Sequence, residues 1–276
     1  AVADHLRRHG FTHFQITSTR AFETIFKIRY EIIGDPMISI VIPNKDHAAD
    51  LKRCITSILE KSTYENYEIV IVENGSETKE IFEYYTSLKE YDNIRVVTYE
   101  KPEGQNGFNY SAVNNFGVKQ TKGDYILLLN NDTEVITVNW MEELLMYAQR
   151  EDVGAAGAKL YYGNKTIQHA GVILGFGGTA GHAFIGKSRY DTGYFGRILC
   201  AQDYSAVTAA CMMTKREAFE AVGGMTEELA VAFNDVDFCL KVRKEGYLVV
   251  YQPRVEAYHY ESKSRGSEDS PEKVAR

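Results

Sequence analysis

Short apolar runs alternate with amphipathic segments over the first 150 residues. Continuous apolar runs are typical of strands covered on both faces, and apolar residues at helical spacing are typical of the helices that cover them. The predicted strands are 38–43, 67–73, 93–100 and 124–129, and the predicted helices are 51–59, 78–90, 109–120 and 140–150. Strands that alternate with helices predict right-handed crossovers and a mainly parallel sheet.

The second half has a less regular pattern. The glycine-rich stretch 171–184 predicts a loop, and the apolar stretch 204–215 predicts a strand that leads into a helix capped by Gly223 and Gly224. The last predicted elements are a short helix within 232–246 and two strands, 247–251 and 254–265.

Composition shifts divide the chain into three parts. Residues 1–35 predict a lead-in segment with a short helix and an edge strand, which can be the end of a preceding domain. Residues 36–265 form the predicted α/β domain, and 266–276 form a polar tail. The first residue is Ala1, so the chain can be a fragment of a longer protein.

Charge and cysteine usage exclude several classes of protein. A net charge of −7 argues against a general nucleic-acid binder, which needs a basic field. The four cysteines lack CxxC spacing, which predicts buried thiols in a reducing compartment and no zinc site. No apolar run approaches the length of a membrane span, and no signal peptide is visible.

Polar side chains follow three of the predicted strands. Because ligands bind beyond the carboxyl ends of parallel strands, 44–46, 73–76 and 130–132 should lie along one edge of the sheet. Asp132 with neutral oxygen ligands suits a hard divalent ion that also binds phosphate oxygens. Asn130 and Asn131 can bond to ribose or phosphate, although the same residues are common in simple turns.

Two later segments carry further candidates. Asp235 lies at a predicted helix start, where it is either an N-cap or a general base whose negative charge the helix favours. His259 follows two apolar neighbours on one strand face and is either a core residue or part of a site. Lys263 and Arg265 could neutralise a diphosphate or belong to a solvated tail.

The glycine pattern 175–180 matches part of a dinucleotide fingerprint. It lies far from the first strand–helix turn and lacks the acidic residue that should follow, so a loop is the better interpretation. The chain also lacks GxxxxGK[ST] and HExxH motifs, which disfavours NTPases and zinc proteases.

Four ordered segments together resemble family 2 glycosyltransferases with the GT-A fold: "ISIVIPNKDHAADLKRCITSIL", "EIVIVENGS", "GDYILLLNNDTEV" and "FNDVDFCLK". The similarity spans about residues 37–265. Within that family, "IQHAGVILG", "YSAVTAACMM" and "YHYESKSRG" resemble rhamnosyltransferase-like enzymes of bacterial polysaccharide and O-antigen assembly. The resemblance implies a nucleotide-diphospho-sugar transferase fold with a mainly parallel central sheet flanked by helices and a Rossmann-like N-terminal half.

The resemblance also implies roles for particular positions. Asp235 falls on the second acid of the family's ED motif and would be the catalytic base. Asp132 is the one acid left of the metal-binding DxD motif, and His259 falls where relatives have a metal-binding histidine. Nucleotide-sugar contacts are implied for Pro43, Asn44, Asp46, Glu73, Asn74, Asn109, Asn130, Asn131, Lys263 and Arg265.

These roles imply an inverting glycosyltransferase that uses Mn²⁺ or Mg²⁺ and a nucleotide-diphosphate sugar. Its acceptor would be a saccharide or lipid-linked saccharide of the bacterial cell surface. The implied location is the cytoplasm, including the inner face of the membrane through partners, with no nucleic acid bound. The glycine-rich segment 175–188, with His182, would shape the acceptor side or act as a lid.

Two alternatives remain open. The chain could be an inactive nucleotide-sugar-binding domain of a larger polysaccharide-assembly protein, which the weakened DxD motif favours. It could also be a nucleotidyltransferase, although the segment after the first strand of the domain lacks a glycine-rich basic phosphate loop.

Overall fold

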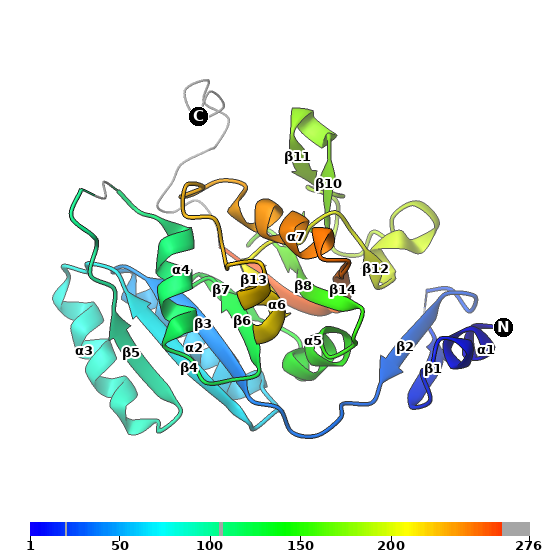
Figure 1. Ribbon diagram of the computed structural model, residues 1–276, viewed down its shortest axis with the longest axis horizontal. Helices are drawn as coiled ribbons and strands as arrows, with labels where there is room; N and C mark the ends of the chain where they lie inside the picture. The colour runs from blue at the N-terminus through cyan, green and yellow to red at the C-terminus, as the bar shows by residue number, and fades with distance from the viewer. Residues whose placement is uncertain (20, 105–106, 261–276) are drawn as a thin grey trace.

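The computed structural model describes residues 1–19, 21–104 and 107–260. A ten-stranded sheet runs through the molecule and carries helices on both faces (Figure 1). The strand order is β12-β14-β8-β13-β6-β3-β4-β5, with β7 beside β14 and β9 beside β8. The chain therefore has the predicted α/β architecture.

The N-terminal half of the sheet is parallel, as its alternating pattern predicts. In this half β3 pairs in parallel with both β4 and β6, and Asn44 at the end of β3 lies opposite Glu73 at the end of β4. Its elements are β3 (Ile38–Asn44), α2 (Ala48–Lys61), β4 (Tyr67–Glu73), α3 (Lys79–Ser87), η1 (Leu88–Glu90), β5 (Ile94–Thr98), α4 (Tyr110–Lys119) and β6 (Tyr125–Leu129).

The C-terminal half of the sheet is mixed and departs from the prediction in several places: among them, the short strands β7, β9 and β12 were not predicted, and β13 forms only the end of the predicted strand 204–215. The two expected last strands form one continuous strand, β14, which pairs in parallel with β8 across a register shift between Gln252 and Glu256. Strand β8 was not predicted, because its alanines and glycines give a weak strand signal. The elements are β7 (Thr133–Val135), α5 (Trp140–Ala148), β8 (Val153–Tyr161), β9 (Ile167–His169), β12 (Gln202–Asp203), β13 (Cys211–Lys215), α6 (Arg216–Ala221), α7 (Asn234–Lys244) and β14 (Leu248–His259).

Two apolar layers hold the helices against the sheet. Helices α2, α3 and α5 contribute Leu51, Ile81 and Trp140 to the layer that includes Ile40 of β3. Helices α4, α6 and α7 pack on the other face, in the layer that includes Val41. Alternate residues of one buried strand thus serve both layers, which explains why its sequence is continuously apolar.

The close approach of α4 to the sheet depends on a glycine. A Cβ atom at Gly117 would lie 2.6 Å from side-chain carbons of both Val41 and Val72. A larger residue would push the helix away from the sheet, because interiors are close-packed.

The expected loop at 171–184 is instead a small hairpin, which corrects the prediction. Strand β10 (Val172–Leu174) pairs antiparallel with β11 (Ala180–His182), and the short η2 helix (Phe176–Gly178) joins them. Gly175 has a φ of 80° and donates its N–H to the carbonyl of Thr179 at 2.8 Å. The glycines therefore build a turn, in agreement with the rejection of a dinucleotide site. A further short helix, η3 (Tyr194–Leu199), follows the hairpin.

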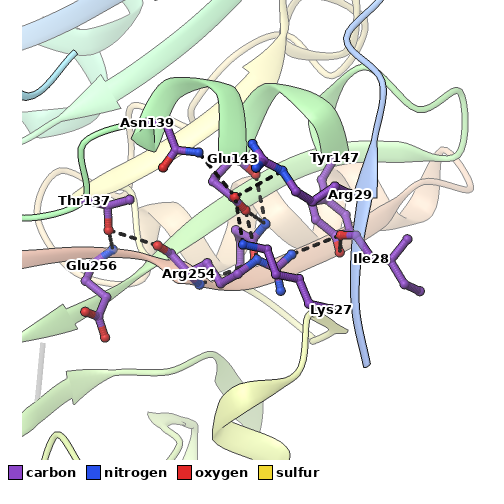
Figure 2. Close-up of polar contacts among 10 residues, drawn as sticks. Lys27, Ile28, Arg29, Thr137, Asn139, Glu143, Tyr147, Arg254 and Glu256 are labelled. Carbon is purple, nitrogen blue, oxygen red and sulfur yellow. Dashed lines mark hydrogen bonds and ion pairs between the residues drawn. The ribbon is translucent and has the colours of Figure 1, made fainter. Parts of the chain in front are cut away.

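The N-terminal segment contacts the α/β domain. It contains α1 (Val2–Arg8) and a hairpin of β1 (Phe14–Ser18) and β2 (Phe26–Tyr30). The backbone carbonyl of Ile28 accepts hydrogen bonds from the guanidinium of Arg254 at 3.1 Å and the hydroxyl of Tyr147 at 3.3 Å (Figure 2). The boundary at 35/36 stays a prediction, and the expected tail 266–276 lies outside the described residues.

A buried carboxylate fastens this hairpin. Glu143 of α5 is only 2% exposed, and its oxygens lie 3.5 Å from Lys27 Nζ, 3.7 Å from Arg29 Nε and 2.9 Å from Arg254 Nε. Figure 2 shows these side chains converging from α5, β2 and β14. Gln252 donates a further hydrogen bond to Glu143 at 3.2 Å.

The cysteines agree largely with the expectation of buried thiols. Cys54, Cys211 and Cys239 are buried and Cys200 is half-buried, and all four are free thiols. Burial raises the pKa of Cys211 to about 12, which makes it a poor nucleophile. Among the helices that the structure describes, none has the length and apolar character of a membrane span.

Candidate functional site

The polar ends of β3, β4 and β6 lie together at one edge of the sheet. Asn131 donates its side-chain N–H to the Asn44 side-chain oxygen at 2.6 Å. The Asn44 amide in turn donates to the hydroxyl of Tyr85 at 2.8 Å, and the Tyr85 hydroxyl donates to Glu73 at 2.6 Å. Parallel pairing in register therefore brings together the residues predicted for the nucleotide pocket.

Glu73 and Asn74 occupy the position predicted to contact the nucleobase, and both are buried. The carboxylate of Glu73 accepts hydrogen bonds from the hydroxyls of Tyr85 and Ser76, each at 2.6 Å. Asn74 is 1% exposed, and its side-chain amide has no hydrogen-bond partner. The structure thus shows Glu73 shaping the loop, and a direct contact of either residue with the base stays a prediction.

Asp46 shapes the same loop. Its carboxylate accepts the backbone N–H groups of Thr78 and Glu77, both at 2.8 Å, and these bonds lower its pKa. Asp46 therefore organises the start of α3. Pro43, the next predicted contact, is buried near the end of β3.

Asp132 and His259 meet across paired strands. Strand β7 pairs antiparallel with β14 so that Thr133 lies opposite His259. This pairing places Asp132 Oδ1 3.2 Å from His259 Nε2. Asn130 lies beside them, with its amide nitrogen 3.0 Å from the same ring nitrogen. Two predicted site residues, Asp132 and Asn130, therefore lie beside the Nε2 atom of a third, His259.

The contacts of His259 favour a tautomer that suits a metal ligand. Gln168 donates its amide N–H to the carbonyl of His259 at 3.4 Å, so its oxygen faces Nδ1 at 2.9 Å. Nδ1 then carries the proton, and Nε2 keeps its lone pair toward Asn130 and Asp132. A second residue that orients the ring in this way is common at metal sites.

The facing atoms of Asp132 and His259 are of the kinds that bind a divalent cation. The Nε2 lone pair and the Asp132 carboxylate are both electron-rich, and Mn²⁺ accepts imidazole nitrogen as well as carboxylate oxygen. Within the described residues, no group of three or more His, Cys, Asp or Glu side chains could hold a metal. The two residues therefore fit an ion that takes its other ligands from a bound diphosphate and water.

Asp235 is the second residue of α7, and the N-cap position belongs to Phe233, so Asp235 is not an N-cap. Its carboxylate accepts the N–H of Ala209 at 3.2 Å and that of Val236 at 2.8 Å. The Tyr110 hydroxyl lies 3.2 Å from the carbonyl oxygen of Ala209 and 3.1 Å from the side-chain oxygen of Asn130, and its one proton can be donated to either. Asp235 is therefore linked to the Asn130 region through one backbone segment and one tyrosine.

Three other predicted contacts have different outcomes. The side chain of Asn109 caps α4 by accepting the N–H of Ala112 at 2.9 Å, and it donates to the carbonyl of Glu227 at 2.9 Å. Its contact with a nucleotide stays a prediction. Lys263 and Arg265 lie outside the described residues.

Sequence reasoning missed the residues that support this site. Gln168 orients His259, and Tyr110 bridges Asn130 to the segment that bonds Asp235. The stretch "IQHAG", residues 167–171, was noted only as part of the family likeness. The sequence did carry one sign of a supporting role: Gln168 and His169 are hydrogen-bonding residues within a short buried strand. Buried polar groups need partners.

Comparisons with known proteins identify the family. The family model for Glycosyl transferase family 2 matches residues 39–223, which includes Asp132 and ends before Asp235. The protein y4gI of Sinorhizobium fredii is 47% identical over 253 residues, covering 91% of this chain and 27% of that protein. The O-antigen biosynthesis protein RfbC of Myxococcus xanthus is 36% identical over 276 residues, covering 99% of this chain and 21% of that protein. The chain thus spans about a quarter of the length of these relatives.

Solved structures show the same fold. GalNAc-T7, solved with UDP, GalNAc and Mn²⁺, superposes with a TM-score of 0.68 at 16% identity, covering 88% of this chain and 47% of that one. The mannosyltransferase PcManGT from Pyrobaculum calidifontis was solved with GDP-Man and Mn²⁺. It superposes with a TM-score of 0.62 at 13% identity, covering 96% of this chain and 65% of that one. The chain has the GT-A fold and belongs to family 2 of the glycosyltransferases.

Proposed function

We propose that this chain transfers a sugar from a nucleotide-diphosphate donor to a saccharide hydroxyl, with inversion at the anomeric carbon. The observation that carries the proposal is the meeting of Asp132 with His259 at the sheet edge where β3, β4 and β6 end. Membership of family 2 supports the reaction class. The relative RfbC, named for O-antigen biosynthesis, supports a role in bacterial cell-surface polysaccharide synthesis.

The donor would bind along this edge. Asn130 and Asn131 offer amide groups to ribose or phosphate oxygens. Both solved GT-A structures contain a nucleotide or nucleotide sugar and Mn²⁺, which supports this class of ligand. Asp132 and His259 would hold a divalent ion, which would supply positive charge to the leaving diphosphate.

The residues of the chain would then act on the acceptor. Asp235 would accept the proton of an acceptor hydroxyl while that oxygen bonds to the anomeric carbon. The bond from that carbon to the diphosphate breaks on the opposite side, so the configuration inverts and a nucleoside diphosphate leaves. Holding the two substrates in line supplies much of the remaining rate. The acceptor would be a saccharide or lipid-linked saccharide at the cytoplasmic face of the membrane.

A thermal-shift panel tests the proposal. UDP-, GDP- and dTDP-sugars are each added with and without Mn²⁺ or Mg²⁺. A donor at about 100 times its Kd stabilises the native state by about 2.7 kcal/mol. We expect at least one nucleotide sugar to raise the melting temperature, and to raise it further with metal. A panel in which no nucleotide raises it would contradict donor binding.

The role of Asp132 is tested by its substitution. Asp132→Asn removes the charge but keeps the size, so we expect the Mn²⁺ concentration for half-maximal donor stabilisation to rise by at least about tenfold. The control is Asp92→Asn, an exposed carboxylate near the opposite end of the strands. Equal metal dependence in both variants would argue against a metal site at Asp132.

A further inference from the structure

Two consecutive aromatic residues of η3 are largely exposed to solvent. Tyr194 is 75% exposed and Phe195 is 83% exposed, and their ring centroids lie 4.6 Å apart in an edge-to-face arrangement. Phe22, in the loop between β1 and β2, is 43% exposed. A Cβ atom at Gly196 would lie 2.2 Å from Ile25 Cδ1 and 3.6 Å from Phe22 Cδ2, so this loop packs against η3. Phe22, Tyr194 and Phe195 therefore form an exposed aromatic patch.

The backbone that carries the aromatic patch is anchored in the core. Ile198 is fully buried, and its carbonyl accepts the hydroxyl of Tyr251 at 3.1 Å. The N–H of Ile198 donates to the carbonyl of Thr192 at 3.1 Å. Phe195 has a φ of 51°, a backbone conformation that costs energy for a bulky side chain. The fold thus holds an apolar ring in water at an energetic cost, which is typical of a binding surface.

Basic side chains accompany the aromatic patch, although the whole chain has a net charge of −7. Lys187 and Arg197 are exposed, and neither forms an ion pair with a carboxylate in the part of the chain that the structure describes. Asp191, the acidic residue between them, uses its carboxylate to accept the N–H of Gly193 at 2.7 Å. Glu23 follows Phe22 and is exposed, so the positive charge lies on the η3 side of the patch.

We propose that the aromatic patch docks the chain on an anionic phospholipid bilayer, with Phe195 inserted beneath the headgroups. A phenylalanine ring supplies apolar surface, and a tyrosine ring with its polar tip suits the headgroup level. Lys187 and Arg197 would attract anionic lipids. Exposed rings suit a protein partner as well, but unpaired cations on an acidic chain favour an anionic surface. Docking would hold the chain at the surface that carries a lipid-linked saccharide, and it does not depend on glycosyl transfer.

Co-sedimentation with unilamellar vesicles tests this surface without any activity. Vesicles of phosphatidylcholine alone are compared with vesicles that contain about 30% phosphatidylglycerol, and we expect the chain to bind the anionic ones. Phe195→Ser should lower the partition coefficient by about tenfold, because binding scales with the apolar area that enters the membrane. The double change Lys187→Gln and Arg197→Gln should lower it by about tenfold on the anionic vesicles at low salt, because each basic residue adds attraction.

The matched control is Phe82→Ser, which removes an exposed ring elsewhere. Phe82 is 48% exposed on α3, at the opposite end of the molecule from the β1–β2 hairpin (Figure 1). This variant should bind vesicles like the wild type, and thermal unfolding checks that each variant keeps its fold. A wild type that binds neither kind of vesicle, or an equal loss of binding in the control and in Phe195→Ser, would overturn the proposal.

Insertion of the ring has its own test in Phe195→Trp. The one native tryptophan, Trp140, is fully buried, so a change of fluorescence on vesicles reports the added indole. We expect its emission to shift to the blue on anionic vesicles and to be quenched by lipids with brominated acyl chains. Binding without quenching would overturn insertion. A wild type that dimerises through the patch, so that Phe195→Ser is monomeric, and that leaves vesicles unbound would assign the patch to a second copy and overturn membrane docking.

Discussion

Asp235→Asn should lower the rate of sugar transfer by about a thousandfold while donor binding persists. General-base catalysis contributes roughly 10²–10⁴-fold, and an amide cannot take the proton of the acceptor hydroxyl. Asparagine keeps the size of the side chain, and its oxygen can still accept the N–H of Ala209. The fold should therefore survive. Nucleoside diphosphate release measures the rate, and the thermal shift with the donor measures binding.

A control lies two residues further along the same helix. Asp237 accepts the hydroxyl of Thr226 at 2.6 Å and lies 3.5 Å from Lys241, so its role is structural. Asp237→Asn should keep most of the activity. If Asp235→Asn transfers sugar at the wild-type rate, Asp235 is not the base. If the wild type binds donors but turns none over, the chain is a binding domain instead of an enzyme.

Glu143→Gln should destabilise the fold by about 3 kcal/mol. Removal of one partner from a buried ion pair typically costs 3–5 kcal/mol, because the other charge stays buried. The contact with Arg254 dominates here, since Lys27 and Arg29 are more exposed and water screens their charges. The loss also weakens the attachment of the β1–β2 hairpin. Urea unfolding measures the stability, and limited proteolysis measures release of the hairpin.

The neighbouring Glu142 provides the comparison. It is partly exposed and accepts the Thr63 hydroxyl at 2.6 Å, a bond that glutamine can keep. Glu142→Gln should change the free energy of unfolding by less than about 0.5 kcal/mol. Similar small changes in both variants would show that the charge of Glu143 is not needed to hold the hairpin.

Local patterns predicted the parallel half of the fold. Strands β3, β4 and β6 are largely apolar, and α2 buries Leu51, Ile55 and Ile58 on one side. These patterns are visible in the sequence because the side of each element that faces the core is set by that element's own residues. Strand β8 lacks this signal, because close neighbours such as Val207 and Val242 require small residues at Gly157 and Gly154. The hairpin β10–β11 was not predicted either, because its glycines are equally common in loops.

By itself, the sequence determined the family, the parallel direction of β3, β4 and β6, and the edge at which Asn44, Glu73 and Asp132 emerge. These follow from strand periodicity and from the polar residues directly after each strand. Only the tertiary structure decided that His259 meets Asp132 through the pairing of β7 with β14, with Gln168 orienting the ring. It also decided the contact of His169 with His182 and the docking of the N-terminal hairpin on Glu143. The physical reason is that these contacts join separate elements, and no local pattern encodes which side chains of two elements will meet when the elements pack together.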